Sequence, residues 1–282
     1  MNEDFCAFIL TNGRPNNVKT TKTLRSRGYT GKIIYIVDDL DSTFPEYIKN
    51  FGSDVEVFSK HEVRKTTDYC DNFNNLKCIL YARNVCFEIA EKLGYKYFIQ
   101  LDDDYTDFRY KYNSKGYYGD WSIKNLDAIF DIMLKYFKRA PFLTIAMSQG
   151  GDFIGGRNGV SGELRRPKRK AMNSFICSTD RPFKFMGTIN EDVNAYVGLG
   201  NKGHLLLTIP DVALQQAQTQ SNAGGLTEMY LEYGTYVKSF YSVIINPSCV
   251  KINLMGGKFK RLHHKIKWNN AVPKIISEEF KK

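Results

Sequence analysis

The sequence predicts an α/β fold in which a mostly parallel sheet is flanked by helices. Two observations support this: short apolar runs alternate with segments of helical periodicity, and several of the apolar runs end in turn-forming or acidic residues. Strands that are apolar on both faces are typical of a parallel sheet covered on both sides. No linker separates independent domains, so one domain of residues 1–282 is expected, with two packed halves, 1–105 and 106–282.

The first half has the more regular pattern. Residues 5–11 (FCAFILT) are predicted to form a buried strand that ends at the turn Asn12-Gly13-Arg14-Pro15. A polar, basic helix is expected around 17–27, and a long helix at 75–94 is ended by Gly94. The further strands expected here are 32–39, 55–60 and 95–105.

The second half begins with a clear helix and strand and then becomes irregular. Residues 122–138 have apolar side chains at helical spacing, and 141–148 (PFLTIAMS) is the next apolar strand. The segment 149–172 is predicted to be a long loop, which in a compact domain is usually functional. The remaining expected elements are strands at 174–178 and 204–209, a loop at 215–225, a helix over 226–241 and a basic tail.

Composition narrows the class of protein. The chain has 282 residues, 43% of them hydrophobic, which is ample for a core and excludes a disordered chain. No apolar run approaches the length of a membrane span, and the first residues lack the basic start of a signal peptide, so a cytoplasmic protein without a membrane partner is expected. The six cysteines show no zinc-binding spacing and are expected to be buried thiols. A net charge of +10 favours an anionic partner.

Three aspartates, Asp102, Asp103 and Asp104, follow the apolar strand YFIQL. Adjacent carboxylates repel one another unless a cation lies among them. Alternate residues at a strand end point the same way, so Asp102 and Asp104 can share one ligand. Oxygen donors of this kind suit Mg²⁺, Mn²⁺ or Ca²⁺, although a solvated acidic turn would also explain the run.

The order of these motifs resembles the GT-A-type glycosyltransferases, which have a Rossmann-type sheet. The resemblance rests on a strand ending in Asn-Gly-Arg-Pro, a strand ending in Asp-Asp, a helix with Ala-Arg-Asn, and then Asp-x-Asp. It implies that residues 1–105 bind a nucleotide sugar, with UDP as the expected nucleotide, through a divalent metal, Mn²⁺ or Mg²⁺, held by Asp102 and Asp104. The residues that it places at the nucleotide sugar are Thr11, Asn12, Arg14, Asp38, Asp39 and Asp103.

Arg83 occupies the apolar stripe of the predicted helix 75–94. A guanidinium on a buried face needs a partner, either a carboxylate of the aspartate cluster or the diphosphate of the donor. Arg83 is therefore counted among the candidate nucleotide-sugar-binding residues, and a purely structural ion pair is the alternative.

Glu191 and Asp192 form an acidic pair well beyond the metal motif. The resemblance implies that one of them, Asp192 by preference, removes the proton from the acceptor hydroxyl. Acidic residues also favour a helix N-terminus, which is a sufficient structural reason for them. The resemblance further makes one of the adjacent residues His263 and His264 a candidate metal ligand, whereas an exposed basic tail is the alternative.

A narrower resemblance is carried by RKAMNSF (169–175), MGTINEDVNAY (186–196) and the late His-His. Together they are similar to the TET-associated glycosyltransferases, which include bacteriophage proteins. That resemblance implies transfer of a sugar to the hydroxymethyl group of a modified pyrimidine in DNA. A protein or polysaccharide acceptor, or an inactive nucleic-acid-binding module of the same fold, remains an alternative.

Basic residues gather in three places: 14–32, the loop 157–172, and the chain from Lys251 onward. Such clusters are able to follow the phosphates of a nucleic acid, and residues 106–282 are accordingly expected to bind the acceptor. The candidate nucleic-acid-binding residues are Arg165, Arg166, Lys168, Arg169 and Lys170. A surface that only confers solubility is the alternative.

Overall fold

A computed structural model describes residues 3–74, 76–113, 115, 118–149, 152, 170–216, 234, 236–255 and 260–273. The strands are β1 (Phe5–Leu10), β2 (Lys32–Asp38), β3 (Val55–Phe58), β4 (Tyr97–Asp102), β5 (Tyr105–Tyr112), β6 (Tyr118–Ser122), β7 (Phe142–Gln149), β8 (Ser174–Ser178), β9 (Leu205–Gln216), β10 (Val250–Met255) and β11 (Arg261–Ile266). The helices are α1 (Lys19–Ser26), α2 (Phe44–Phe51), α3 (Lys60–Lys65), α4 (Leu80–Lys92), α5 (Leu126–Arg139), α6 (Glu191–Asn201) and α8 (Val237–Ile245), with a 3₁₀ turn at Gly52–Asp54.

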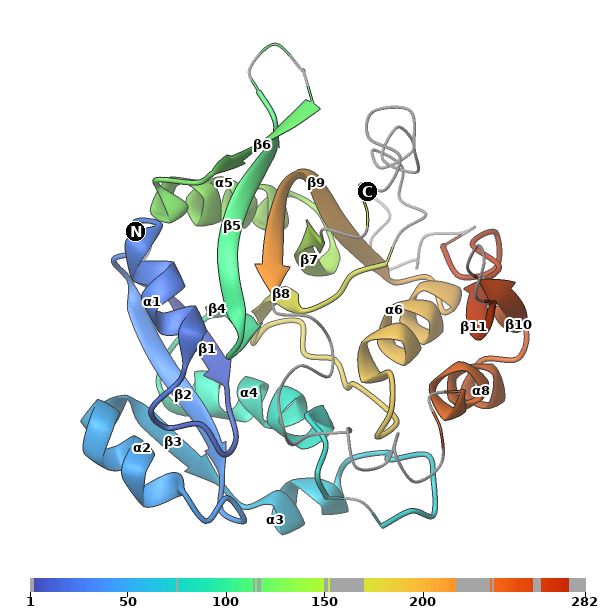
Figure 1. Cartoon of the computed structure of the whole chain (residues 1–282), viewed down its shortest axis with the longest axis horizontal. Helices are drawn as coiled ribbons and strands as arrows, with labels where there is room; N and C mark the ends of the chain where they lie inside the picture. Colours follow the sequence, from blue (N-terminus) through green and yellow to red (C-terminus); the bar gives the residue numbers. More distant parts are fainter. Residues whose placement is uncertain are drawn as a thin grey trace.

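The described residues form a nine-stranded sheet in the order β3-β2-β1-β4-β8-β7-β9-β5-β6 (Figure 1). β1 pairs in parallel with β2 and β4, β2 with β3, and β7 with β9. Only β8 and β5 run against the other strands of this sheet, as their antiparallel pairings require. The predicted α/β class with a mostly parallel sheet is confirmed.

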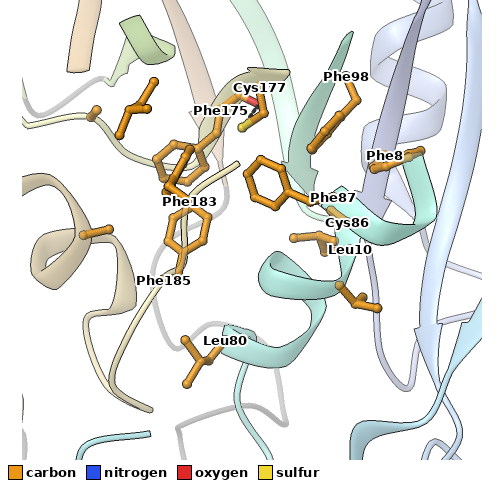
Figure 2. Close-up of a cluster of buried hydrophobic side chains, with 14 of the residues drawn as sticks. Phe8, Leu10, Leu80, Cys86, Phe87, Phe98, Phe175, Cys177, Phe183 and Phe185 are labelled. Carbon is orange, nitrogen blue, oxygen red and sulfur yellow. Dashed lines mark hydrogen bonds between the residues drawn. The ribbon is translucent and has the colours of Figure 1, made fainter. Parts of the chain in front are cut away.

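Helices cover both faces of the sheet, as the doubly apolar strands predicted. Alternate residues of β1 belong to different cores: Phe8 packs with α4 and α6, whereas Ile9 packs with α1, α2 and α5. Figure 2 shows the first core, in which Phe87 of α4 contacts Phe98 of β4 and Phe183 edge to face. These two apolar layers fix the strand ends on which the site is built.

Several elements differ from the sequence-based prediction. The strands β5 and β6 occupy 105–122, where no element beyond the start of a helix was expected, and β9 continues through Gln216 into the predicted loop. Polar residues interrupt the apolar pattern in both cases, and the strands form because β5 and β9 pair with each other. Most of the helix expected over 226–241 lies outside the described residues, namely 226–233 and 235, and the described helix α8 begins at Val237 and continues to Ile245.

The basic tail is also ordered differently from the prediction. β10 and β11 pair as an antiparallel ribbon, which lies against α8 and beside α6 at one edge of the molecule (Figure 1). Ser239 of α8 donates a hydrogen bond to the Leu262 carbonyl of the ribbon at 3.0 Å. Among the described helices, none combines the length and the apolar character needed to cross a membrane.

Candidate active site

The candidate site lies at the edge of the sheet where β1, β2 and β4 end. Leu10, the last residue of β1, is in register with Ile36 of β2 and Asp102 of β4. The loops that follow these three strands therefore meet, as expected for ligand-binding edges of parallel sheets. The reversed strands β8 and β5 begin at this same edge, with Ser174 and Tyr105.

The loop after β1 is tied to the middle aspartate of the cluster. The Thr11 hydroxyl donates to Asp103 Oδ2 at 2.8 Å, and the Arg14 guanidinium donates to Asp103 Oδ1 at 2.8 Å. Tyr47 of α2 braces the same loop, since its hydroxyl accepts from the Arg14 amide at 2.8 Å and lies 2.8 Å from the Thr11 hydroxyl. Asp103 thus turns away from its neighbours, toward the loop that contains Thr11 and Arg14.

The end of β2 carries a second polar cluster. Asp38 is buried and forms an ion pair with the buried Lys60 of α3 at 2.8 Å. The Asn12 amide donates to the same carboxylate oxygen of Asp38 at 2.9 Å. Asp39 is exposed, and it accepts from the Lys60 amide at 3.0 Å at the start of α3. Asn12 and Asp38 are therefore brought together, while Asp39 is used at a helix end.

Arg83 connects the end of β4 to the start of α6. Its NH2 group donates to Asp102 Oδ1 at 2.9 Å, and its Nε donates to Glu191 Oε1 at 2.9 Å. The guanidinium also lies over the rings of Phe175 and Phe185, at 5.0 and 5.8 Å from their centroids (both rings are labelled in Figure 2). The two carboxylates raise the pKa of Arg83 against the opposing effect of burial, so the side chain is a permanent cation.

The burial of Arg83 is close to complete, at 1% exposure, and its NH1 group has no hydrogen-bond partner among the described residues. An ion pair with a carboxylate is thus confirmed as one of the two partners expected for this arginine. Because the two carboxylates are bonded to Nε and NH2, NH1 is the nitrogen of this guanidinium that has no acceptor among the described residues. Leaving a buried donor unpaired costs about 1–3 kcal/mol, which favours a ligand atom at that position.

Asp104 differs from the other two aspartates because it forms no ion pair with the described residues. Partial burial raises the pKa of its carboxyl group to about 6, and the charges of Asp102 and Asp103 add to this effect. The pKa of Asp102 is raised by its own burial, although Arg83 opposes the shift. Negative charge in this cluster is therefore only partly compensated by the protein.

The acidic pair opens helix α6, as expected. Asn190 precedes it in the left-handed conformation, with a φ of 55°, and its side chain donates to the Lys238 carbonyl at 2.6 Å and the Ser242 hydroxyl at 3.0 Å. Both carboxyl groups are buried, and burial raises the pKa of each, while Lys238 opposes the shift at Asp192. Glu191 is held by Arg83, whereas Asp192 forms no ion pair within the described part of the chain.

The two histidines lie on β11 rather than in an exposed tail. Their rings are 4.4 Å apart, and the pKa of His264 is lowered to about 4, chiefly by burial and then by the positive charges of His263, Lys238 and Lys170. His264 is therefore neutral at pH 7, and its Nδ1 has no hydrogen-bond partner among the described residues. Across the described residues, no three or more His, Cys, Asp or Glu side chains gather closely enough to hold a metal ion.

The structure describes little of the predicted basic loop. Arg165, Arg166, Lys168 and Arg169 lie outside the described residues. Lys170 is described, and its ammonium group forms an ion pair with Asp152 at 3.1 Å and a hydrogen bond with Gln149 at 3.3 Å. Its charge is thus partly neutralised within the protein.

Sequence reasoning missed three residues of the site. The Thr20 hydroxyl donates to the Asp102 carbonyl at 2.6 Å and accepts from the Tyr105 amide at 3.0 Å, so α1 fixes the turn of the aspartate cluster. Lys60 and Tyr47 support Asp38 and the first loop. A lysine directly following Phe58-Ser59 at a strand end was a usable signal for Lys60, but nothing local distinguished Thr20 from its neighbours.

Comparison with known proteins identifies the class. Residues 5–225 match the family model described as TET-Associated Glycosyltransferase, which covers well over half of the chain. The protein is therefore a glycosyltransferase. It belongs to the TET-associated glycosyltransferase family, and the resemblance noted from the sequence is confirmed. No curated protein matches the chain.

Solved structures of similar shape share little sequence with the chain. A mannosyltransferase from Pyrobaculum calidifontis, in complex with GDP-Man and Mn²⁺, is 10% identical with a TM-score of 0.47, over 78% of this chain and 58% of its own. Glucosyl-3-phosphoglycerate synthase from Mycobacterium tuberculosis is 9% identical with a TM-score of 0.44, over 93% and 86%. TarS 1–349 of S. aureus, in complex with UDP-GlcNAc, is 11% identical with a TM-score of 0.46, over 80% and 63%.

Proposed function

We propose that this glycosyltransferase transfers a sugar from a nucleotide sugar, with UDP as the nucleotide, to the hydroxymethyl group of a modified pyrimidine in DNA, and that it requires Mn²⁺ or Mg²⁺. The main observation in support of the catalytic part is that Arg83 forms ion pairs with both Asp102 and Glu191, which joins the aspartate cluster to the acidic pair of α6. The acceptor part is supported by the family to which the chain belongs. With a DNA acceptor the protein would act in the cytoplasm, which would be that of the host cell if the protein is of phage origin.

The aspartate cluster fits a divalent metal. Mg²⁺ is usually bound through one or two carboxylates together with substrate phosphates, so a cage of three protein ligands is not needed. Asp102 and Asp104 would supply hard oxygen donors, and the incompletely compensated charge around Asp104 favours a cation there. When bound, the metal would act as a Lewis acid on the diphosphate leaving group. His264, the other expected ligand, does not gather with these two aspartates among the described residues, so the metal is assigned to Asp102 and Asp104 with the diphosphate.

The donor nucleotide is assigned to the loops after β1 and β2. Asn12, Arg14 and Asp38 lie at the ends of these strands, where an α/β sheet binds its ligands. Asn12 is held by its hydrogen bond to Asp38, and Arg14 is held by its hydrogen bond to Asp103. Thr11 and Asp103 are assigned to support the loop after β1 through the hydrogen bond between them. Asp39 is exposed in the loop after β2. The unpartnered NH1 group of Arg83 is assigned to a donor phosphate oxygen.

Asp192 is assigned as the general base. Glu191 is held by an ion pair with Arg83, whereas Asp192 is buried without an ion pair to the described residues, so Asp192 is the carboxylate of the pair that no cation holds back from accepting a proton. In the transfer, the proton of the acceptor hydroxyl moves to Asp192 while the acceptor oxygen bonds to the anomeric carbon. The bond from that carbon to the diphosphate oxygen breaks, and the nucleoside diphosphate leaves with the electron pair.

The test is a panel of nucleotide sugars incubated with Mn²⁺ and duplex DNA that contains hydroxymethylcytosine or hydroxymethyluracil. We expect one sugar to add its mass to one of the modified nucleosides, with inversion at the anomeric carbon, and no change to unmodified DNA. The Asp192→Asn variant is expected to transfer about 10²–10⁴-fold more slowly. Asp180→Asn, at an exposed aspartate beyond β8, is the matched control and should retain full activity.

Three results would contradict parts of the proposal. Transfer to a protein or polysaccharide, with no reaction on modified DNA, would overturn the acceptor. Full activity of the purified protein in the presence of a metal chelator would overturn the metal requirement. Retention of anomeric configuration would remove Asp192 from the role of general base, because a single displacement inverts that centre.

A further inference from the structure

The ribbon formed by β10 and β11 has two unlike faces. The face toward the molecule carries buried and half-buried side chains, except for the exposed Leu254 and Leu262 further along the strands, and the outer face is mostly exposed. The inner set near the base of the ribbon is Val250, Ile252, His264 and Ile266. The exposed outer set is Lys251, Asn253, Met255, Arg261 and Lys265.

Positive charges are opposed across this outer face. Lys251 is directly paired with Lys265 in the antiparallel register, and Arg261 is paired with Met255 further along the same face. Like charges directly opposite each other destabilise a strand pair. None of these three cations forms an ion pair with the described residues, although cations elsewhere do, such as Lys32 with Asp54 at 2.5 Å.

The described parts of the ribbon and of α8 contain no acid to balance these charges. The described segments 236–255 and 260–273 contain six Lys or Arg residues and no Asp or Glu. An ordinary solvated surface mixes both signs of charge. A ribbon that keeps two lysines face to face, with no ion pair to the described residues, is therefore suited to an anion from outside the chain.

We infer that the outer face of the β10–β11 ribbon binds the phosphate backbone of DNA, through Lys251, Arg261 and Lys265. This inference rests on the proposed function for the choice of DNA as the polyanion. Residues on one face of a strand repeat about every 6.6 Å, so the three cations span several successive phosphates of one DNA strand. A two-stranded ribbon also has the dimensions that the major groove admits.

The ribbon is placed where acceptor DNA would have to be held. α8 contacts the ribbon through Ser239 and Leu262, and it contacts the start of α6 through the Lys238 carbonyl and Asn190. Figure 1 shows the ribbon beside both helices. DNA bound to the ribbon would thus lie next to the helix that presents Asp192.

An anionic lipid surface fits this face less well. Membrane-binding surfaces combine cations with apolar side chains that enter the bilayer. The exposed Leu254 and Leu262 are paired with each other on the opposite face of the ribbon. Among the described residues of the outer face, Met255 is the one exposed apolar side chain. The cations are therefore largely separated from the apolar groups.

The test compares two triple variants of the full chain. The ribbon variant combines Lys251→Gln, Arg261→Gln and Lys265→Gln. The control variant changes three exposed cations on other elements to Gln: Lys49 of α2, and Lys135 and Arg139 of α5. Binding to an unmodified duplex oligonucleotide, without nucleotide sugar, is measured by fluorescence anisotropy from 50 to 200 mM salt. The slope of log affinity against log salt is expected to fall by about 2–3 for the ribbon variant and to stay unchanged for the control.

The outcomes separate this inference from the proposed function. The ribbon variant is shown to be folded if its melting temperature and its metal-dependent hydrolysis of the nucleotide sugar are unchanged. A second variant that keeps the charges, Lys251→Arg with Lys265→Arg, should bind DNA like the original protein. A salt slope equal in the ribbon variant and the original protein overturns the inference, even if sugar transfer to DNA succeeds. Stronger binding to phosphatidylserine vesicles than to DNA, lost in the same variant, also overturns it. A reduced slope with no sugar transfer upholds the inference and counts against the proposed acceptor.

Discussion

The three consecutive aspartates have three different environments. Asp102 is paired with Arg83, Asp103 with Arg14 and Thr11, and Asp104 with no cation of the described residues. The protein therefore neutralises two carboxylates internally and leaves the charge of the third for a ligand. Charge that is left uncompensated in a folded protein weakens its stability, so function and stability are opposed at Asp104.

Replacement of Asp104 by Asn is expected to stabilise the metal-free protein at pH 7 by on the order of 1 kcal/mol. The pKa of Asp104 is raised to about 6 in the folded state, so the original protein loses stability as the pH rises from about 4 to about 6. The advantage of the variant should therefore vanish below about pH 4, where the aspartate is protonated in both states. Urea unfolding across this pH range is the measurement.

The same variant is expected to lose its response to metal. Mn²⁺ should raise the melting temperature of the original protein, because a ligand of the folded state stabilises it, and should leave Asp104→Asn unchanged. Asp131→Asn, on the surface helix α5, serves as the control and should respond like the original protein. An equal shift of melting temperature in Asp104→Asn would remove that residue from the metal site.

Among the elements, α1 has a role beyond covering the sheet. Its Thr20 is fully buried and links two strands, since the hydroxyl donates to the carbonyl of Asp102 at the end of β4 and accepts from the amide of Tyr105 at the start of β5. The Thr20 amide also donates to the Asp103 carbonyl at 3.1 Å. One residue of the helix therefore sets the conformation of the aspartate turn.

Replacement of Thr20 by Val is expected to cost about 1–3 kcal/mol, because the buried Tyr105 amide and Asp102 carbonyl lose their partner. It should also raise the KM for the nucleotide sugar, since the turn that carries Asp104 is released. Thr21→Val removes a hydroxyl that lies 3.0 Å from the Tyr35 hydroxyl, away from the turn, and is expected to alter stability alone. A normal KM in Thr20→Val would show that α1 supports only the fold.

At the scale of the whole molecule, one sheet joins the two halves of the sequence. β4 of the first half pairs with β8 of the second, and β8 pairs in turn with β7. α5, from the second half, packs on the same core as Phe5 and Ile9 of β1. The two halves therefore share both their hydrogen bonds and their apolar layers.

A single cooperative unfolding transition is expected for this reason. The two tryptophans report on distant parts: Trp121 belongs to β6 at one end of the sheet, and Trp268 stacks on Tyr196 of α6. In the variants Trp121→Phe and Trp268→Phe, the fluorescence midpoint should coincide with the midpoint from circular dichroism of the same variant. Separate midpoints in either variant would mean that the halves unfold as independent domains.

The sequence was sufficient for the features that depend on local pattern. The strands β1, β2 and β4 were predictable because each is a continuous apolar run with a polar stop, and Arg83 stood out because it interrupts an apolar stripe. β5 and the ribbon were not predictable, since their polar and basic residues become strands only through pairing with a partner. The division of Asp102, Asp103 and Asp104 among separate partners likewise depends on tertiary contacts.

The bridge that Arg83 makes between Asp102 and Glu191 has a consequence for how this enzyme can change over generations. Loss of the arginine alone would leave one buried and one half-buried carboxylate without their cation, and loss of either acid alone would unbalance a cation that is 1% exposed. Descendants are therefore expected to inherit the three residues as a set or to replace them together. A mutational screen that restores an Arg83→Met enzyme should recover second changes at Glu191 in preference to other positions.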